Sequence, residues 1–222
     1  MPEIRIAVSL TEENPGPLDS VEPLVDYWEI RMDLVGPRWP ELAAKLKKPW
    51  IACNRSPQEG GRGQSEEKIR VNELLRGVEA GAAIVDIELS SAALENVVSR
   101  VKKRAQCLIS YHNVDETPDL AALMQIVRRQ AEAGADIVKV VTHAQSLRDN
   151  LCLLELVRLN PKTRVISFAM GDQGRISRIL SPLAGAFITF ASLETGKESA
   201  PGQIEVGEMR RIYQLVQNSR WD

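Results

Sequence analysis

Lys139 stands in the middle of the apolar run Ile137-Val138-Lys139-Val140-Val141, whose composition is that of a parallel β-strand covered on both faces. Lysine is rarely buried without a reason, and removing water from its ammonium favours the neutral amine. A neutral amine is a nucleophile that can attack a ketone and form a Schiff base. Two structural roles fit the same residue: its head could reach solvent, or it could pair with a structural carboxylate.

His112 ends a second apolar run, 107–112, which precedes the Lys139 run in the sequence. Residues two apart share one face of a strand, so His112 and Lys139 could both face the same interior. Neighbouring strands are about 5 Å apart, so one bound molecule could touch both side chains. Histidine works as a general acid or base near neutral pH, although a lone histidine can also be a hydrogen-bonded loop residue.

Polar residues recur at or after the ends of the other predicted strands, where a buried charge needs a partner. They are Ser9, Glu29, Arg31, Arg55, Glu59, Asp86, Glu88, Arg178, Ser199 and Gln203, and Met170 ends a strand on the same side. Arg55 and Arg178 could instead lie on the solvated surface, and Glu29 with Arg31 could form an interior salt bridge. The glycine-rich loop 59–63 could be a phosphate-binding nest or a flexible lid.

The elements that would position these residues alternate between strands and helices. Strands are predicted at 4–10, 27–34, 50–55, 83–89, 107–112, 133–141, 164–170 and 186–191. Helices are predicted at 21–25, 40–48, 66–79, 92–104, 117–133, 146–159, 175–183 and 207–217. Thr117 and Pro118 are the predicted N-cap and first position of one helix, Pro49 stops another, and Gly81 terminates a third.

This order of elements predicts a (β/α)8 TIM barrel, an α/β fold with eight parallel strands inside a ring of helices. Strand starts advance by about 25 to 30 residues, which is typical of one βα unit. A weak internal repeat supports the period, because 79–86 resembles 132–139. The rival fold is a doubly wound open sheet, which usually carries a glycine-rich first turn that this chain lacks. In a TIM barrel the active site lies at the carboxyl ends of the strands, where the polar residues fall.

Composition and charge limit the partners that the protein can have. The chain has 222 residues, and we expect one barrel domain over 1–222. A net charge of −2 gives no basic field for nucleic acid or an anionic membrane, and no segment is apolar for the length of a membrane span. The first residues enter a strand without the apolar core of a signal peptide, so we expect a soluble, cytoplasmic protein.

Metal and disulfide chemistry are not expected from this sequence. Cys53, Cys107 and Cys152 are far apart, and no CxxC pair occurs. His112 and His143 are the two histidines. This set lacks the ligand spacing of a zinc site and the framework of a disulfide-rich fold. We therefore expect no metal site and a reducing compartment.

Six short motifs follow the predicted strands in order along the chain. They are Glu29-Ile30-Arg31-Met32-Asp33, Arg55-Ser56 with Glu59-Gly60-Gly61, Ser110-Tyr111-His112, Asp136-Ile137-Val138-Lys139, Met170-Gly171 with Ser177-Arg178, and Ser199-Ala200-Pro201-Gly202-Gln203. Their order and spacing resemble those of type I 3-dehydroquinate dehydratases, which belong to the shikimate pathway of aromatic amino acid biosynthesis. The resemblance covers almost the whole chain. It implies a cofactor-free lyase that acts on the small molecule 3-dehydroquinate and forms a homodimer.

The resemblance also implies a role for each matching residue. Lys139 is the implied Schiff-base lysine, His112 the general acid/base, and Glu59 the carboxylate that assists the histidine. The implied substrate-binding residues are Ser9, Glu29, Arg31, Arg55, Arg178, Ser199, Gln203, Met170 and Phe190. Arg178 is the candidate for the substrate carboxylate, because guanidinium can bind a carboxylate through two hydrogen bonds. Phe168 departs from the pattern, since some members carry methionine there, and it could alter packing over the substrate.

The implied reaction dehydrates 3-dehydroquinate to 3-dehydroshikimate. Lys139 attacks the C3 ketone, and His112 removes the C2 proton and then protonates the leaving C1 hydroxyl. The residues leave two alternatives open: a Schiff-base aldolase acting on a phosphorylated sugar, and a non-catalytic barrel that binds or regulates a partner. The aldolase predicts a phosphate cradle after the seventh and eighth strands, for which residues 171–174 are poor because Asp172 would repel phosphate.

Overall fold

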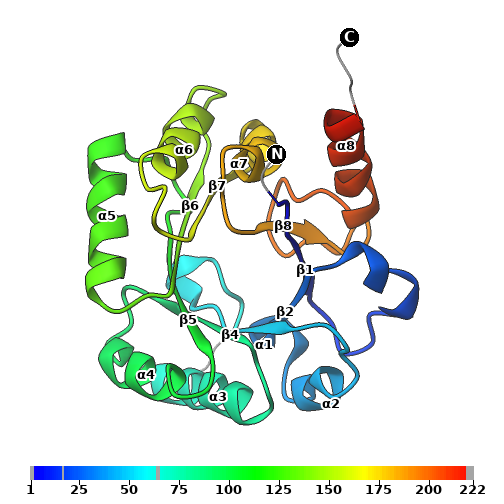
Figure 1. The fold of residues 1–222 in the computed structure, drawn as a ribbon. Helices are drawn as coiled ribbons and strands as arrows, with labels where there is room; N and C mark the ends of the chain where they lie inside the picture. Colours follow the sequence, from blue (N-terminus) through cyan, green and yellow to red (C-terminus); the bar gives the residue numbers. More distant parts are fainter. Residues whose placement is uncertain (1–2, 17, 64–65, 219–222) are drawn as a thin grey trace.

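The computed structural model describes residues 3–16, 18–63 and 66–218, and its centre is a sheet of eight parallel strands (Figure 1). The strands are β1 (Ile6–Leu10), β2 (Tyr27–Arg31), β3 (Trp50–Cys53), β4 (Ile84–Glu88), β5 (Gln106–His112), β6 (Ile137–His143), β7 (Val165–Met170) and β8 (Thr189–Ser192). Their order is β7-β6-β5-β4-β3-β2-β1-β8. The backbone N–H of Phe187 donates to the carbonyl of Val165 at 2.8 Å, which links the segment before β8 to β7. The sheet therefore closes almost completely, which confirms the predicted (β/α)8 barrel.

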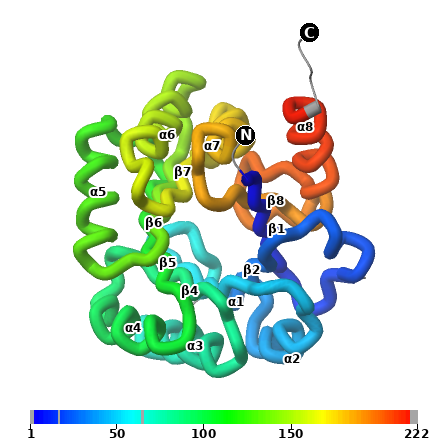
Figure 2. The backbone as a smooth tube through the Cα atoms, in the orientation of Figure 1, coloured from blue at the N-terminus to red at the C-terminus, as the bar shows by residue number. Residues whose placement is uncertain are grey.

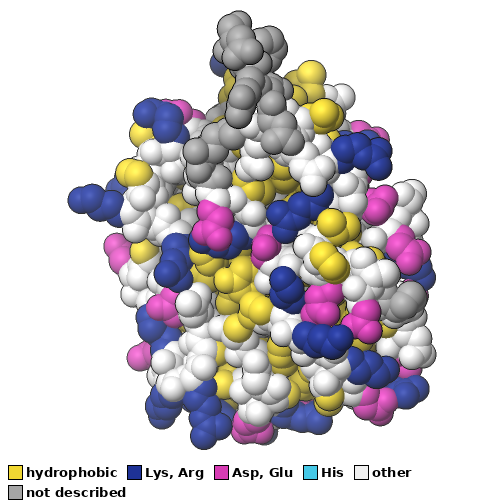
Figure 3. Space-filling model, turned by 45° about the vertical axis from the view of Figure 1, so that its right-hand side comes forward, with side chains coloured by type: hydrophobic (Ala, Val, Ile, Leu, Met, Phe, Trp, Pro, Cys, Tyr) yellow, Lys and Arg dark blue, Asp and Glu magenta, His cyan; other side chains and the backbone are white. Residues whose placement is uncertain are grey.

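Helices surround the strands on the outside of the barrel (Figures 1 and 2). They are α1 (Met32–Val35), α2 (Trp39–Ala43), α3 (Glu67–Glu79), α4 (Leu94–Val101), α5 (Leu120–Glu132), α6 (Asp149–Arg158), α7 (Arg175–Leu183) and α8 (Val206–Asn218), with one-turn helices η1 (Leu18–Ser20), η2 (Glu22–Leu24), η3 (Pro57–Glu59) and η4 (Asp172–Gly174). No helix in the described ranges has both the length and the apolar character needed to cross a bilayer. On the face shown in Figure 3, basic and acidic side chains are interspersed.

The alternation of side chains along β6 turns Lys139 toward the inside of the barrel. Val138 and Val140 pack in an outer cluster with apolar residues of α5 and α6, whereas Ile137 and Val141 belong to the cluster inside the barrel. Other members of the inner cluster are Ala7, Ile51, Ile84, Leu108, Ile166 and Ile188. Because residues two apart share a face, Lys139 points with Ile137 and Val141 into the interior, as predicted.

The strand predicted at 27–34 is shorter in the structure, where β2 ends at Arg31 and α1 follows at once. Asp33 accounts for the change. Its carboxylate accepts hydrogen bonds from the Arg31 guanidinium and from the backbone N–H groups of Arg55 and Arg62. These bonds hold residue 33 beside the end of β3 instead of letting the chain extend, so the alternating pattern beyond Arg31 was misleading.

Other element ends also differ from the prediction. β3 stops at Cys53, before residues 54 and 55, and β8 begins at Thr189 rather than at 186. β6 begins at Ile137, not within 133–136, and runs on to His143. The helix predicted at 40–48 ends at Ala43, well before Pro49. Gly81 follows α3 with a φ of 92°, which is the left-handed conformation expected of a helix-terminating glycine.

The N-cap predicted at Thr117 was wrong. Helix α5 begins at Leu120, and its N-cap is Asp119, whose side chain accepts the backbone N–H of Ala122 at 2.8 Å. The hydroxyl of Thr117 instead lies 2.7 Å from the hydroxyl of Thr142 on β6. A tertiary contact therefore uses the threonine, and the aspartate two residues later caps the helix.

Candidate active site

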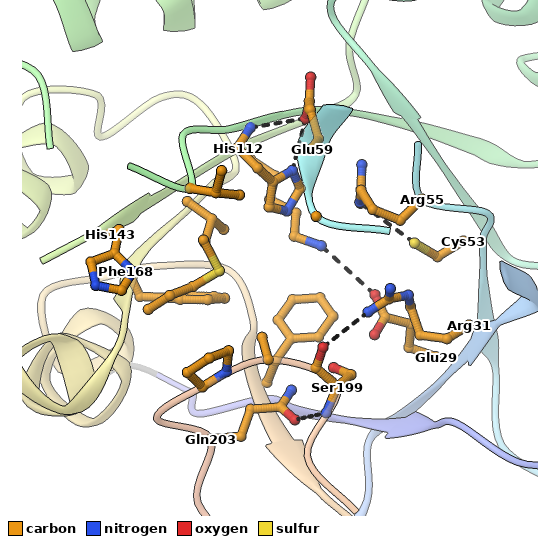
Figure 4. Close-up of a pocket in the computed structure, with 18 of the residues that line it drawn as sticks. Glu29, Arg31, Cys53, Arg55, Glu59, His112, His143, Phe168, Ser199 and Gln203 are labelled. Atoms are coloured by element: carbon orange, nitrogen blue, oxygen red, sulfur yellow. Dashed lines mark hydrogen bonds and ion pairs between the residues drawn. The ribbon is translucent and has the colours of Figure 1, made fainter. Parts of the chain in front are cut away.

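A cavity of about 250 Å³ opens at the carboxyl ends of the strands. Every predicted catalytic and substrate-binding residue except Ser9 lines it. Figure 4 shows Glu29, Arg31 and Arg55 on one side of this cavity, with Phe168 and His143 on the opposite side. The barrel therefore brings together residues that are up to about 170 positions apart in the sequence, as its carboxyl-end geometry predicts.

Lys139 is 4% exposed, so its ammonium does not reach the surface. Its Nζ donates a hydrogen bond to Oδ2 of Asp86 at 2.9 Å and lies 3.7 Å from Oε1 of Glu29. The ring centroid of Phe190 lies 4.3 Å from the same nitrogen. The lysine is thus enclosed by two carboxylates and an aromatic face, with the remaining side open to the cavity that it lines.

His112 and Glu59 form a hydrogen-bonded pair at the cavity (Figure 4). Oε2 of Glu59 lies 2.9 Å from Nδ1 of His112 and also accepts the backbone N–H of the same residue at 2.9 Å. Ser90 donates its hydroxyl to the other carboxylate oxygen. When Glu59 is ionised, Nδ1 must carry the hydrogen, which leaves the lone pair on Nε2 available as a base.

The electrostatics of this pair favour a neutral histidine. Burial lowers the pKa of His112 well below its usual value, and the charges of Arg55 and Lys139 act in the same direction. Burial raises the pKa of Glu59 to about 7, against the opposing charge of Arg55. A neutral imidazole can accept a proton at once, so the site holds a base ready for use near neutral pH.

The loop that carries Glu59 is neither a phosphate nest nor a free lid over its described part. The backbone N–H groups of Glu59, Gly60 and Gly61 donate to carbonyls of residues 56 and 57, and that of Arg62 donates to Asp33. A Cβ on Gly61 would lie only 2.0 Å from the carbonyl oxygen at position 55, so only glycine permits this close packing. Gln64, which directly follows this loop, lies outside the described residues.

Arg55 is 4% exposed at the side chain, so the surface interpretation was wrong. Nη2 donates to Asp86 at 2.6 Å, and Nη1 donates to Glu88 at 2.9 Å and to the hydroxyl of Ser110 at 2.6 Å. Glu88 is bonded in turn by the buried Arg70 of α3 at 2.6 Å. The guanidinium of Arg55 is therefore held rigidly by protein groups at the edge of the cavity.

Glu29 and Arg31 do not pair with each other, as an interior salt bridge would require; each has another partner. Arg31 forms a two-pronged contact with Asp33, at 2.9 and 2.7 Å, and reaches the carbonyl of Ser199 at 3.5 Å. Glu29 accepts the hydroxyl of Ser9 at 2.5 Å and faces Lys139. Ser9 therefore contacts Glu29 but does not itself line the cavity.

Arg178 on α7 is 1% exposed and has no carboxylate oxygen within 4.0 Å among the residues that the structure describes. Its Nη2 donates to the carbonyl of Pro201 at 3.3 Å, and its guanidinium carbon lies 4.5 Å from the ring centroid of Phe168. Its Nε is buried without a hydrogen-bond partner. Burial lowers the pKa of Arg178 to about 9. A buried cation that lines a cavity, with no ion pair to a carboxylate in the described part of the chain, is suited to an anionic ligand.

The remaining predicted residues form the wall after β7 and β8. The backbone N–H of Ser199 donates to Oε1 of Gln203 at 2.7 Å, and Nε2 of Gln203 lies 3.4 Å from the hydroxyl of Ser9. Met170 and Phe190 supply apolar surface from β7 and β8. The ring of Phe168 packs against that of Phe190, with the centroids 5.9 Å apart.

Sequence reasoning gave Asp86 and Glu88 no role, although both stood among the polar strand residues. The structure places Asp86 against Lys139 and Glu88 between two buried arginines. Their alternation with apolar neighbours on β4 signalled that both face inward. His143 and Cys53 also line the cavity and were not predicted there.

Ligand atoms of Glu29, Cys53 and Asp86 lie within 4.8 Å of one another, which raises the question of a metal ion. The donor set does not fit one. Burial raises the pKa of the Cys53 thiol, so the thiolate that metals bind is disfavoured. Asp86 already binds Arg55 and Lys139, and Glu29 faces the same lysine.

A nearly closed barrel of βα units, with a buried lysine and a histidine–carboxylate pair in one cavity at the carboxyl ends of its strands, defines a TIM-barrel enzyme. A family model described as type I 3-dehydroquinase matches residues 5–220. The chain belongs to this family, and it is an enzyme of the hydro-lyase class, as the six motifs predicted.

Individual relatives agree with the family match. A 3-dehydroquinate dehydratase of Dehalococcoides mccartyi is 43% identical over 190 residues, which cover 86% of each chain. The solved 3-dehydroquinate dehydratase of Aquifex aeolicus is 30% identical with a TM-score of 0.81, over 97% of this chain and 100% of that one. That of Geobacillus kaustophilus is 26% identical with a TM-score of 0.84, over 98% and 93%.

Proposed function

We propose that this chain dehydrates 3-dehydroquinate to 3-dehydroshikimate through a Schiff base on Lys139, with His112 as the general acid and base. The observation that carries the proposal is the position of Lys139, buried at 4% exposure with its Nζ beside the cavity that His112 also lines. A buried amine and a neutral imidazole that face one cavity have the two functions that imine-based dehydration needs.

The first stage is formation of the imine. The neutral amine of Lys139 adds to the C3 carbonyl, and the carbinolamine then expels its oxygen as water. The product is an iminium, in which the nitrogen keeps one hydrogen and carries the positive charge. This charge withdraws electrons from C2 and acidifies its hydrogens.

The second stage is the elimination. Nε2 of His112 takes a proton from C2, and the C–H electron pair moves toward nitrogen to give a neutral enamine. The imidazolium then protonates the C1 hydroxyl, which leaves as water while the enamine electrons form the new double bond. Glu59 stabilises the imidazolium through Nδ1, 2.9 Å away, and keeps the ring oriented. Hydrolysis of the conjugated iminium returns the amine and releases the enone.

Substrate orientation rests on the unpaired cation. Arg178 binds the substrate carboxylate, because it is a buried guanidinium at the cavity without a carboxylate partner among the described residues. The substrate hydroxyls contact polar groups of the opposite wall and of the loop after β8. We assign this role to Glu29, Arg31, Arg55, Ser199 and Gln203, with Ser9 supporting Glu29 and with Met170 and Phe190 as apolar walls.

The phosphosugar aldolase alternative has less support from the cavity. The backbone N–H of Gly171 donates to Pro201, and that of Gly174 donates to Gly171, so neither is free to bind phosphate. The side chain of Asp172 is 95% exposed beside this turn and would repel a dianion. We further propose that the barrel acts as one catalytic domain over 1–222, as a cytoplasmic homodimer without cofactor; residues 1–2 and 219–222 lie outside the described part.

Borohydride trapping tests the proposed function. Protein mixed with 3-dehydroquinate is reduced with sodium borohydride, digested and analysed by mass spectrometry. We expect a secondary amine on Lys139 and loss of activity, both dependent on the ketone. The Lys139→Met variant is the matched control and should give neither adduct nor turnover. An adduct on another lysine, or undiminished turnover of the variant, would disprove the Schiff-base mechanism.

A further inference from the structure

Asp86 touches the nitrogen that becomes the iminium, although it does not line the cavity. It lies on β4, two strands away from the β6 strand of Lys139, and Ser110 of β5 stands between them. Oδ1 accepts the Ser110 hydroxyl at 2.6 Å, while Oδ2 accepts both Lys139 at 2.9 Å and Arg55 at 2.6 Å. Both carboxylate oxygens are therefore occupied, and one of them is bonded to the reacting atom.

The surroundings of Asp86 favour its ionised form. Burial alone would raise the pKa of this carboxyl, but the charges of Arg55 and Lys139 hold it well below its usual value. Further titratable groups around Lys139 and Asp86 are Glu29 of β2, Cys53 of β3 and His112 of β5. Glu29 is less suited to the same task, since 3.7 Å exceeds hydrogen-bond distance.

We propose that Asp86 is a further catalytic residue, the counter-ion that holds the N–H of the iminium on Lys139 and keeps that nitrogen protonated through the elimination. This inference rests on the proposed Schiff-base function and adds to it a group that the reaction needs besides the lysine and the histidine. Nζ of the free lysine already makes this contact at 2.9 Å, so the carboxylate needs no rearrangement when the iminium forms.

The nitrogen changes charge twice in each turnover, and the fixed anion matters at both steps. Removal of the C2 proton converts the iminium into a neutral enamine, and departure of water restores the iminium. An unprotonated imine could not accept the C–H electrons, so loss of the N–H would stop the reaction. Asp86 opposes that loss because a nearby negative charge favours the protonated form.

Arg55 limits how strongly the Asp86 carboxylate attracts the lysine nitrogen. A lone carboxylate beside Lys139 would hold the ammonium and delay release of the neutral amine that must attack the ketone. Arg55 shares the same Oδ2 at 2.6 Å, and Ser110 occupies Oδ1, so part of the negative charge is already compensated. The network therefore balances two opposing needs of a Schiff-base lysine.

The test compares Asp86→Asn with Glu88→Gln. Both changes replace a buried carboxylate on β4 with an amide, and both remove a negatively charged partner of Arg55. Only Asp86 contacts Lys139. The two readouts are the pH at which borohydride trapping of 3-dehydroquinate is half-maximal and the rate of turnover. We expect Asp86→Asn to move the half-maximal pH downward, because the ammonium loses its nearest anion, and to lower kcat by about 10²-fold.

The expected results differ if the ion pairs of Asp86 with Arg55 and Lys139 only stabilise the fold. In that case both variants would lose thermal stability, and the half-maximal pH would stay where it is in the unchanged protein or would move equally in both. Either outcome would overturn the proposal for Asp86. Absence of any trapped adduct in the unchanged protein would instead disprove the Schiff-base function. Failure of the proposal for Asp86 and failure of the proposed function can therefore be told apart.

A second measurement leaves Asp86 in place, in case Asp86→Asn does not fold. The His112→Ala variant, labelled with ¹⁵N-lysine, is mixed with 3-dehydroquinate so that the adduct stops before the elimination. Protonated iminium and neutral imine have well-separated ¹⁵N chemical shifts. We expect the protonated form over the whole pH range in which the protein stays folded. A neutral imine near pH 7 would overturn the role of Asp86.

Discussion

Replacement of Arg178 by methionine should weaken substrate binding and stabilise the protein at the same time. The side chain is 1% exposed, and its charge has no carboxylate partner within 4.0 Å in the described residues. A charge-assisted, two-pronged contact with a substrate carboxylate is worth about 2–3 kcal/mol. Loss of that energy corresponds to a rise of about 30- to 150-fold in KM.

The stability of the free protein should move in the opposite direction. Burial disfavours the charge of Arg178 in the folded protein and lowers its pKa to about 9. Methionine fills a similar volume without the charge, at the expense of the Pro201 hydrogen bond and the contact with the Phe168 ring. We expect a gain of about 1–2 kcal/mol in the free energy of unfolding. For a chain of this size, each kcal/mol raises Tm by about 2–4 °C.

The assay follows the absorbance of the enone product for kinetics and thermal unfolding by circular dichroism for Tm. Arg175→Met is the matched control, because it removes a cation from the same helix whose side chain is 55% exposed. It should leave KM and Tm nearly unchanged. If Arg178→Met leaves KM unaltered, the substrate carboxylate binds elsewhere, and if it lowers Tm, Arg178 contributes more to the fold than its burial costs.

Lys139→Ala should abolish dehydration while circular dichroism shows that the barrel is still folded. Lys139→Arg should be equally inactive because guanidinium keeps its proton, and near-normal turnover of either variant would refute the mechanism. His112→Ala should form the imine and then stall, so that mass spectra show an adduct without borohydride, whereas continued turnover without an adduct would contradict its role. Glu59→Gln should slow turnover by about 10²-fold, less than His112→Ala, and the reverse order would exchange the two roles. Turnover should also fall as pH drops through about 7, because the raised pKa of Glu59 makes the carboxylate neutral there and Nδ1 of His112 loses its charged acceptor. If the Glu59→Gln variant shows the same fall in turnover, another group is responsible for it.

The sequence by itself determined the barrel and the inward direction of its key residues. Repeated βα units have a regular length, and residues two apart share a strand face, so Lys139 could be placed inside from its neighbours alone. The carboxyl-end rule then brought His112 and Lys139 to one cavity. These features depend on periodicity, which a sequence records directly.

Contacts with distant parts of the chain decided where several elements begin or end. Thr117 and Asp119 are both able to cap a helix, and the hydrogen bond between Thr117 and Thr142 of β6 left the aspartate to do so. Asp33 ended β2 early because groups from a distant loop donate to its carboxylate. Such contacts join residues far apart in the chain, so no local pattern reports them.

Only the tertiary structure decided which charges pair. Glu29 and Arg31 are two residues apart and oppositely charged, yet Glu29 faces Lys139 while Arg31 binds Asp33. Lys139 takes Asp86 from two strands away. The reason is geometric: strand register and the closure of the barrel set the distances between inward side chains. Because the interaction of two charges weakens as their separation grows, these distances decide which pairs are strongest.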